Sequence, residues 1–447
     1  MNNSRREILK VSTAVTLGML SPLKASTPKN KIDGSQSNYK APLDSPKGKR
    51  VVVVGGGWSG LSVAKHVKLF APESDVVLVE QKDIFVSCPI SNLWLVDKVE
   101  MEFLTHDFLK AAKNFGYTYF HATVIGLDKK NSIVHTSNGY IKYDHIVFAP
   151  GIDYDYTCWT KDVELQNRLY NQYPPAFKPG SEHLSLKRKI HNFKGGTFII
   201  TVPAGNYRCL PAPYERACLI ADFFKHKKIK AKVLVLDENN DITIKEQGFH
   251  SAFKDLYKNI IEWVPNAIIE KFDLDNKKVY TEFDEYDFED AIFYPHVRGA
   301  KILETVNIAK DTVYNRLEGN INPMTYEVYG HPNIYVSGDA RPMGFSKSGN
   351  TSFSEGQYVA KLIANKLTTK PKIKWHSPVT LCISAVQAYP KERGIFIHSE
   401  YAYNQKTKRF GFATPVTNEI WQGKIGIDNG KYVYRWAKAI YTDMFGS

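Results

Sequence analysis

The strongest constraint on the fold is a set of three glycines that directly follows an apolar segment. Val51 to Val54 have the pattern of a buried strand, and the glycines Gly55, Gly57 and Gly60 come next with the spacing G-x-G-x-x-G. The first glycine allows a tight turn, the second lets the backbone approach a pyrophosphate, and the third lets a helix pack closely. Glu80 ends a second apolar strand, where a carboxylate accepts hydrogen bonds from an adenosine ribose. The segment therefore predicts a Rossmann-like dinucleotide-binding domain.

Two later segments indicate which dinucleotide is bound. Residues 143–151, YDHIVFAPG, end in Ala149-Pro150-Gly151, and residues 333–343, NIYVSGDARPM, contain Gly338-Asp339. Both are similar to signatures of flavoproteins with two dinucleotide-binding domains, in which the aspartate holds the ribitol of FAD. The resemblance implies FAD as cofactor and an FAD domain that is discontinuous in sequence. A helix expected over about 354–367 would direct its positive N-terminus toward the flavin, which stabilises an anionic reduced form.

The inserted middle domain has lost its own nucleotide fingerprint. The apolar run Phe198 to Val202 is followed by Pro203, where a turn glycine is expected, and Tyr207 fills space that a pyrophosphate needs. The segment predicts that NAD(P)H is not used. Cys209 follows in a proline-bearing loop, beside Arg208, which favours a thiolate over a thiol.

These segments together predict an α/β protein. We expect two Rossmann-like dinucleotide-binding domains and a C-terminal α+β domain in a glutathione-reductase-like arrangement. The expected divisions are a leader over 1–25, a linker or arm over 26–48, the first part of the FAD domain over 49–160, the second Rossmann-like domain over 161–316, the second part of the FAD domain over 317–370, and the C-terminal domain over 371–447.

The N-terminus has the pattern of an export signal. Arg5 and Arg6 precede the apolar run Val11 to Leu20 and a region of small residues that ends near Ala25. This pattern resembles a twin-arginine leader, which carries folded proteins across the membrane. We expect a periplasmic protein that acquires its cofactor before export. The apolar run is too short for a membrane span, so no integral span is predicted.

The chain is basic, with 59 lysines and arginines against 46 acidic residues and a net charge of +13. The leader carries four basic residues and one acid, which leaves +10 on the mature chain. The basic residues are scattered and no recognition module is present, so nucleic acid is not expected as a partner. A solvated basic surface and attraction of an acidic redox partner both remain open.

The five cysteines limit the redox chemistry available. They are Cys88, Cys158, Cys209, Cys218 and Cys382, and they form neither a CxxC nor a CxxCH motif. We therefore expect no thioredoxin-like pair and no haem in this chain. The histidines lack ligand spacing, so no metal site is predicted.

Five motifs in chain order resemble the family of flavoprotein subunits of flavocytochrome c sulfide dehydrogenase. They are FVSCPISN (85–92), YRCLPAPYERA (207–217), FSKSGNTSFSEGQ (345–357), SPVTLCISAV (377–386) and DMFG (443–446). The resemblance implies a thioether from Cys88 to the flavin, a redox-active disulfide between Cys209 and Cys382, and oxidation of hydrosulfide to sulfur or polysulfide. It also implies a c-type cytochrome subunit as partner in a heterodimer.

Some features depart from the family or lie outside it. The loop reads Cys209-Leu210-Pro211 where the family more often has Cys-Pro-Pro, and Cys158 and Cys218 match no family position. His296 is either a proton acceptor for hydrosulfide or a surface or core residue. A sulfide:quinone oxidoreductase and a flavin-bearing assembly factor without turnover remain the alternative functions.

Overall fold

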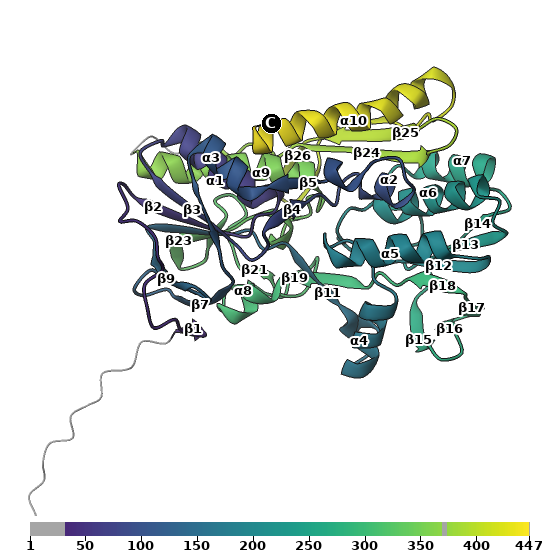
Figure 1. Cartoon of the computed structure of the whole chain (residues 1–447), viewed down its shortest axis with the longest axis horizontal. Coiled ribbons are helices and arrows are strands. Elements are labelled where there is room, and N and C mark those ends of the chain that lie inside the picture. Colours follow the sequence, from purple (N-terminus) through teal and green to yellow (C-terminus); the bar gives the residue numbers. More distant parts are fainter. Residues whose placement is uncertain (1–31, 369–372, 447) are drawn as a thin grey trace, which may run out of the picture. The chain divides into compact units, whose positions relative to one another are not determined.

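The computed structural model describes residues 32–368 and 373–446. The predicted leader therefore lies outside the described residues. Within Ile32–Ser447, Figure 1 shows one group of strands around β2 and β3 and another around β12 and β13, with α10 lying along β24 and β25. The fold class predicted above is confirmed: two Rossmann-like sheets are followed by a C-terminal unit of strands and one long helix.

The FAD domain is built on a six-stranded sheet in the order β22-β23-β10-β2-β3-β6. These strands are parallel except β22, and they span Glu327–Val328, His331–Val336, His145–Phe148, Arg50–Val54, Asp75–Glu80 and Thr118–His121. All five residues of β2 are buried, as a run of valines in a central strand requires. The sheet joins strands that precede the second domain in sequence with strands that follow it, so the FAD domain is discontinuous as predicted.

Two helices of the FAD domain pack against each other beside this sheet. They are α1 (Trp58–Phe70), which follows β2, and α9 (Gly349–Leu367). Helix α9 begins at Gly349, earlier than predicted, because the Ser348 side chain accepts a hydrogen bond from the Thr351 amide and caps the first turn. The remaining elements of this domain are α2 (Ser91–Leu95), η1 (Met101–Phe103), α3 (Phe108–Phe115), η3 (Gly338–Ala340), β4 (Ile84–Val86) and β5 (Thr105–Asp107).

A smaller antiparallel sheet orders part of the predicted arm. Its strands are β1 (Asp33–Gly34), β7 (Val124–Asp128), β8 (Ile133–Thr136) and β9 (Gly139–Lys142). Strand β1 pairs with β7, and Lys40 forms a bridge to Tyr140 of β9, with Ser37 and Ala41 buried. The arm is thus held by strand pairing despite its lack of apolar periodicity.

The second domain has a parallel sheet in the order β14-β13-β12-β18. These strands span Ile261–Val264, Ala231–Asp237, Gly196–Val202 and Asp290–Ile292. Its helices are α4 (Val163–Gln172), α5 (Ser181–Asn192), α6 (Ala212–His226) and α7 (Glu246–Leu256), and an antiparallel ribbon is formed by β15 (Ile269–Asp273), β16 (Lys278–Thr281) and β17 (Glu285–Asp287). The antiparallel pair of β11 (Ile152–Asp155) and β19 (His296–Gly299) lies where the chain passes between the FAD domain and the second domain. The short elements that follow these two strands are η2 (Tyr156–Cys158), α8 (Lys301–Thr305), β20 (Ala309–Lys310) and β21 (Glu318–Gly319).

The C-terminal unit brings β24 beside helix α6 of the second domain. Strands β24 (Thr380–Gln387), β25 (Arg393–Ser399) and β28 (Val416–Asn418) form an antiparallel sheet, and β26 (Tyr401–Asn404) pairs with β27 (Arg409–Phe412). Helix α10 (Gly423–Phe445) packs on β24 and β25, while α6 also contacts β24. No helix in the described part of the chain is long and apolar enough to cross a membrane.

Candidate active site

The predicted glycine turn lines a cavity of about 750 Å³ at the carboxyl end of β2. A Cβ atom on Gly57 would meet nothing within 4 Å, whereas a Cβ on Gly60 would lie 1.8 Å from the Gly55 carbonyl oxygen. Gly55 itself has φ +101°, a conformation that favours glycine. The middle glycine therefore keeps space open for a ligand, and the last one allows α1 to pack against the turn.

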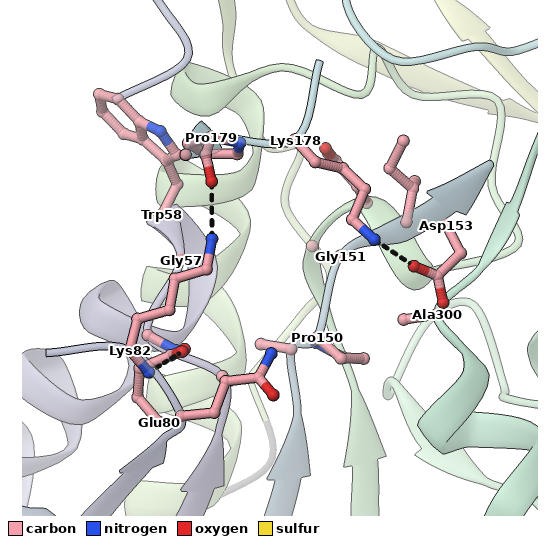
Figure 2. A pocket seen from close by; sticks show the side chains of 18 of the residues that line it. Gly57, Trp58, Glu80, Lys82, Pro150, Gly151, Asp153, Lys178, Pro179 and Ala300 are labelled. Atoms are coloured by element: carbon pink, nitrogen blue, oxygen red, sulfur yellow. Dashed lines mark hydrogen bonds and ion pairs between the residues drawn. The ribbon is translucent and has the colours of Figure 1, made fainter. Parts of the chain in front are cut away.

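Glu80 lies at the rim of this cavity, as predicted. Its carboxylate accepts hydrogen bonds from the Gly56 amide at 2.5 Å and the Lys82 amide at 2.9 Å, which orient it toward the glycine turn. Figure 2 shows two lysines on the walls: Lys82 donates to the Pro179 carbonyl at 2.7 Å, and Lys178 pairs with Asp153 at 2.5 Å. The cavity thus combines a carboxylate that can accept hydrogen bonds from a ribose with the positive charges of two lysines.

The other predicted cofactor residues line the same cavity from the far side. Ala149 and Gly151 follow β10, and Gly338 and Asp339 follow β23. Asp339 accepts a hydrogen bond from Ser352 of α9 at 2.9 Å and pairs with Arg208 at 3.2 Å. A Cβ on Gly151 would meet nothing within 4 Å, so the backbone is open to a ligand there also. The open glycines, the two carboxylates and the capped N-terminus of α9 fit FAD.

A smaller cavity adjoins the first one, and three cysteines line it. Arg208 and Gly349 belong to the walls of both cavities. Cys88 follows β4, Cys209 comes from the loop between β12 and α6, and Cys382 lies in β24. The three cysteines assigned roles by the family resemblance are thus gathered at one place, from three separate parts of the chain.

Cys209 is held in a strained backbone conformation. Its φ is +61°, which a residue with a side chain seldom adopts. The Cys209 amide donates to the Lys347 carbonyl at 2.8 Å, and the Cys209 carbonyl accepts from the Ala212 amide at 2.9 Å. Such strain is held in place by its surroundings and often marks functional positions. These hydrogen bonds hold the Cys209 backbone in place even though Leu210 replaces the family's proline.

Cys209 and Cys382 lie in contact as free thiols. The Cys209 thiol donates a hydrogen bond to the Cys382 sulfur, and this bond, with the charge of Lys245, lowers the pKa of Cys382 to about 6 despite burial. The same bond and burial raise the pKa of Cys209 well above its usual range. The structure therefore brings the predicted pair together, and the redox disulfide between them stays a prediction.

Cys88 lies in the same cavity with a different environment. Its thiol donates to the Phe177 carbonyl at 3.6 Å, and burial raises its pKa. The Cys88 sulfur thus contacts the second domain, while the Cys88 backbone follows strand β4 of the FAD domain. The thioether to the flavin stays a prediction.

Two charged residues at the cysteines have no role in the sequence analysis. Glu215 of α6 accepts hydrogen bonds from the Ala385 amide at 3.0 Å and from Asn92 at 3.2 Å, and burial raises its pKa to about 7. Lys245, which precedes α7, donates to Ser384 at 2.6 Å and lies 3.9 Å from the Cys382 sulfur. Glu215 could have been found from its place in the motif around Cys209; for Lys245 the sequence offers no local signal.

The turn after β12 differs from a nucleotide-binding turn, as expected. The Ala204 amide donates to the Glu238 carboxylate at 3.0 Å, and Tyr207 is fully buried beneath the loop. Glu238 also pairs with His296 at 2.6 Å, which raises the pKa of this histidine. His296 is not among the described residues that line either cavity, so the geometry favours a structural role for it.

The remaining cysteines and a cluster of possible metal ligands lie outside this site. Cys218 is fully buried in α6 and Cys158 is exposed at the end of η2, both as free thiols. Asp241, Glu246 and His250 place their ligand atoms within 4.8 Å of one another, which the sequence spacing did not indicate. Asp241 and His250 already form an ion pair at 2.7 Å.

Comparisons with known proteins agree with this arrangement. The central region of the sulfide dehydrogenase [flavocytochrome c] flavoprotein chain matches residues 184–292, and the pyridine nucleotide-disulphide oxidoreductase family matches residues 49–167. The sulfide dehydrogenase flavoprotein chain of Chlorobaculum thiosulfatiphilum is 57% identical over 44 residues, which are 10% of this chain and 92% of that sequence. The mitochondrial sulfide:quinone oxidoreductase of Dictyostelium discoideum is 28% identical over 193 residues, which are 41% of this chain and 40% of that protein.

Among solved structures, the sulfide:quinone oxidoreductase of Aquifex aeolicus has the same fold. Its TM-score is 0.72 at 16% identity, over 89% of this chain and 92% of that one. The fold and the cavity at the glycine turn define a flavoprotein oxidoreductase with two dinucleotide-binding domains that binds FAD. The chain belongs to the family of the flavocytochrome c sulfide dehydrogenase flavoprotein chain.

Proposed function

We propose that this protein is an exported sulfide dehydrogenase that oxidises hydrosulfide through Cys209 and Cys382 and passes electrons to a c-type cytochrome. The observation that carries the proposal is the contact between these two thiols in the cavity that adjoins the FAD cavity. The match to the flavocytochrome c family supports the choice of substrate and of acceptor.

The proposed reaction is thiol–disulfide exchange on the oxidised pair. Hydrosulfide attacks one sulfur, so the bond between the cysteines breaks, a persulfide forms on one cysteine and a thiolate leaves on the other. A second hydrosulfide attacks the outer sulfur of the persulfide and releases disulfane, which loses a proton to give hydrodisulfide. The cysteines are left reduced, with two electrons gained. FAD, when bound, accepts an electron pair and can release electrons singly.

The residues of this chain prepare the site for that exchange. Asp339 and Glu80 would hold the FAD through its hydroxyl groups, and the strained loop keeps Cys209 against Cys382. Glu215 can hold a proton near neutral pH because burial raises its pKa to about 7. Above about pH 7 it is ionised and can take up a proton that leaves the substrate.

We also propose that Cys88 carries a thioether to FAD. Cys88 lines the cysteine cavity, whose walls share Arg208 and Gly349 with the FAD cavity. A covalent link would prevent cofactor loss outside the cytoplasm. Because the chain has no CxxCH motif, we place the haem on a separate cytochrome subunit, in a heterodimer. The filled turn after β12 supports a reaction without NAD(P)H.

The test uses the mature protein exported by its own host. After acid precipitation, we expect flavin in the pellet of the wild type and in the supernatant of Cys88→Ser. In sulfide titrations, Cys209→Ser and Cys382→Ser should each slow flavin bleaching and cytochrome c reduction about a hundredfold or more, as loss of a reacting group does. Cys158→Ser is the control and should bleach at the wild-type rate. Normal bleaching in both Cys209→Ser and Cys382→Ser would refute the disulfide mechanism and favour an assembly factor.

The proposed export has its own test. Arg5→Lys combined with Arg6→Lys changes the twin-arginine pair and keeps its charge. We expect the variant to stay in the cytoplasm, because the export route recognises the arginines themselves. Cell fractionation followed by immunoblotting measures this. The control is Arg188→Lys, a substitution within α5, and this variant should be exported. Finding the double variant in the periplasm would contradict the proposal.

The alternative acceptor is quinone, because two of the relatives above are sulfide:quinone oxidoreductases. Helix α10 carries several charges, which disfavour deep insertion into a bilayer. They lie at Lys424, Asp428, Lys431, Arg435, Lys438 and Asp443. A protein that sediments with membranes and reduces a short-chain quinone faster than cytochrome c would establish this alternative.

A further inference from the structure

Lys245 is a buried lysine with an unusual set of neighbours. Its residue is only 3% exposed, and its backbone takes a left-handed conformation with φ 56° just before α7. The Nζ atom donates to Ser384 Oγ at 2.6 Å and to the Cys382 carbonyl at 3.3 Å, and it lies 3.9 Å from Cys382 Sγ. These three polar contacts are all to one short stretch of β24, and the same ammonium group lies over the Phe249 ring of α7, 5.8 Å from its centroid.

No carboxylate within the described part of the chain forms an ion pair with Lys245. Burying a charge is costly unless an opposite charge compensates it. The contacts of Lys245 are neutral except for the Cys382 sulfur, which becomes an anion when its proton is lost. A thiolate on Cys382 would therefore complete the pair, and a thiolate on Cys209 would not, since the described contacts of Lys245 do not include that sulfur.

The other groups that face Cys382 agree with this assignment. From the loop before α6, the Cys209 thiol donates a hydrogen bond to the Cys382 sulfur. From α6, Glu215 faces both Cys382 and Lys245: burial raises its pKa to about 7, while the charge of Lys245 acts to lower that pKa and Cys382 acts to raise it. Glu215 carries its proton below about pH 7, and in that range the ammonium of Lys245, 3.9 Å from the Cys382 sulfur, is the charge that lowers the pKa of Cys382.

We propose that Lys245 is a positioning residue that places the thiolate on Cys382 and makes this sulfur the leaving group when hydrosulfide attacks the disulfide. The substrate sulfur is then carried by Cys209. The second half of this inference rests on the proposed function, whereas the place of the thiolate can be measured without sulfide.

The sequence of bonds follows from this assignment. Hydrosulfide attacks the Cys209 sulfur, the Cys209–Cys382 bond breaks, and a Cys209 persulfide forms. The electron pair of the broken bond stays on Cys382 as a thiolate beside Lys245. In thiol–disulfide exchange the sulfur with the lower pKa leaves faster, so a cation at Cys382 directs attack to Cys209. The substrate sulfur is oxidised and the disulfide is reduced by two electrons.

The first experiment locates the thiolate in the full-length, FAD-loaded protein. The protein is reduced under anaerobic conditions and alkylated with iodoacetamide from pH 5 to pH 9, and each cysteine peptide is quantified by mass spectrometry. We expect Cys382 to react before Cys209, with a midpoint near its pKa of about 6. Earlier alkylation of Cys209 would overturn the assignment in the wild type itself, so this result does not depend on any variant folding.

Three variants test the part played by Lys245. Lys245→Met and Lys245→Gln remove the charge, and the glutamine keeps a donor for Ser384. Because a neighbouring opposite charge shifts a pKa by about 1–3 units, both should move the Cys382 midpoint upward by about one pH unit or more. Lys245→Arg keeps the charge and should keep the low midpoint. A wild-type profile in Lys245→Met or Lys245→Gln would overturn the role of Lys245.

The second experiment locates the persulfide. The oxidised wild-type protein receives one equivalent of sulfide and is alkylated at once, and the extra sulfur is assigned to a cysteine peptide. We expect it on Cys209, and finding it on Cys382 would overturn the leaving-group assignment. A protein that forms no persulfide on either cysteine would refute the sulfide chemistry together with the proposed function, while the alkylation profile would still decide where the thiolate lies.

Discussion

At the scale of single residues, the site depends on charges that are removed from water. Glu215 is partly buried, and amide donors from Ala385 and Asn92 only partly replace its hydration. Burial raises its pKa from 4.5 to about 7. The same desolvation that makes this carboxyl a useful proton holder also makes the folded protein sensitive to pH.

Glu215 should make the folded protein less stable as pH rises from about 4.5 to 7. In this window the folded state keeps a proton on Glu215 that the unfolded state has lost, so rising pH favours unfolding. Glu215→Gln should reduce the slope of the free energy of unfolding against pH, measured by urea denaturation of the FAD-loaded protein. The slope should not vanish, because burial also raises the pKa of Glu355 to about 7.

The control for this prediction is Glu282→Gln, at an exposed position in the second domain. It should leave the pH dependence of stability unchanged. Equal slopes for Glu215→Gln and the wild type would mean that Glu215 is already ionised in the folded protein at acidic pH.

At the scale of elements, the turn between β2 and α1 contains one glycine that is needed for binding the cofactor and another that is needed for folding. Gly57 has φ −77°, which alanine adopts readily, and a Cβ there faces open space in the FAD cavity. Gly60 instead lies against the Gly55 carbonyl, with no room for a Cβ. Two glycines of one motif are therefore needed for different physical reasons.

Gly57→Ala should fold normally and bind FAD more weakly by about tenfold or more, which corresponds to about 1.4 kcal/mol. The measurement is made in a Cys88→Ser background, so that FAD is free to dissociate, by fluorescence titration of the apoprotein. The apoprotein's thermal midpoint should stay near that of the Cys88→Ser parent.

Gly60→Ala is the matched comparison, because the same added methyl group would meet backbone. It should lower the thermal midpoint of the apoprotein itself or prevent folding. Unchanged FAD affinity in Gly57→Ala would show that the backbone at Gly57 is not approached by the cofactor.

At the scale of the whole molecule, the positive charge bears on the proposed partner. The mature chain carries +10 if the leader is removed as predicted. A charge of this size attracts acidic proteins at long range, and added salt weakens this attraction by screening the charges. Reduction of an acidic c-type cytochrome should therefore slow by about tenfold or more as salt rises from low to high ionic strength.

Stopped-flow measurement of cytochrome reduction by the sulfide-reduced protein tests this expectation. A basic cytochrome c is the control, and its reduction should not slow as salt is added. An acidic cytochrome with a rate independent of salt would show that the net charge does not guide the encounter and that the basic surface is only solvated.

The sequence determined the FAD-binding half because its signals are local. The spacing of Gly55, Gly57 and Gly60 after a buried strand dictates a turn and a helix, and Glu80 follows one strand later. Each of these residues needs only its near neighbours in the chain to take its place. The α/β class and the discontinuous FAD domain followed from these motifs, and the structure confirmed both.

Only the tertiary structure decided how the cysteine site is assembled. Cys209 and Cys382 were paired by resemblance to a family, and they meet because β24 packs against α6. Lys245 reaches Cys382 from the start of α7, and no pattern in the sequence marks it. Contacts between residues far apart in the chain depend on how whole elements pack, and the pKa values of buried groups depend on those contacts. Local patterns could therefore predict the cofactor fold but not the charges that govern its thiols.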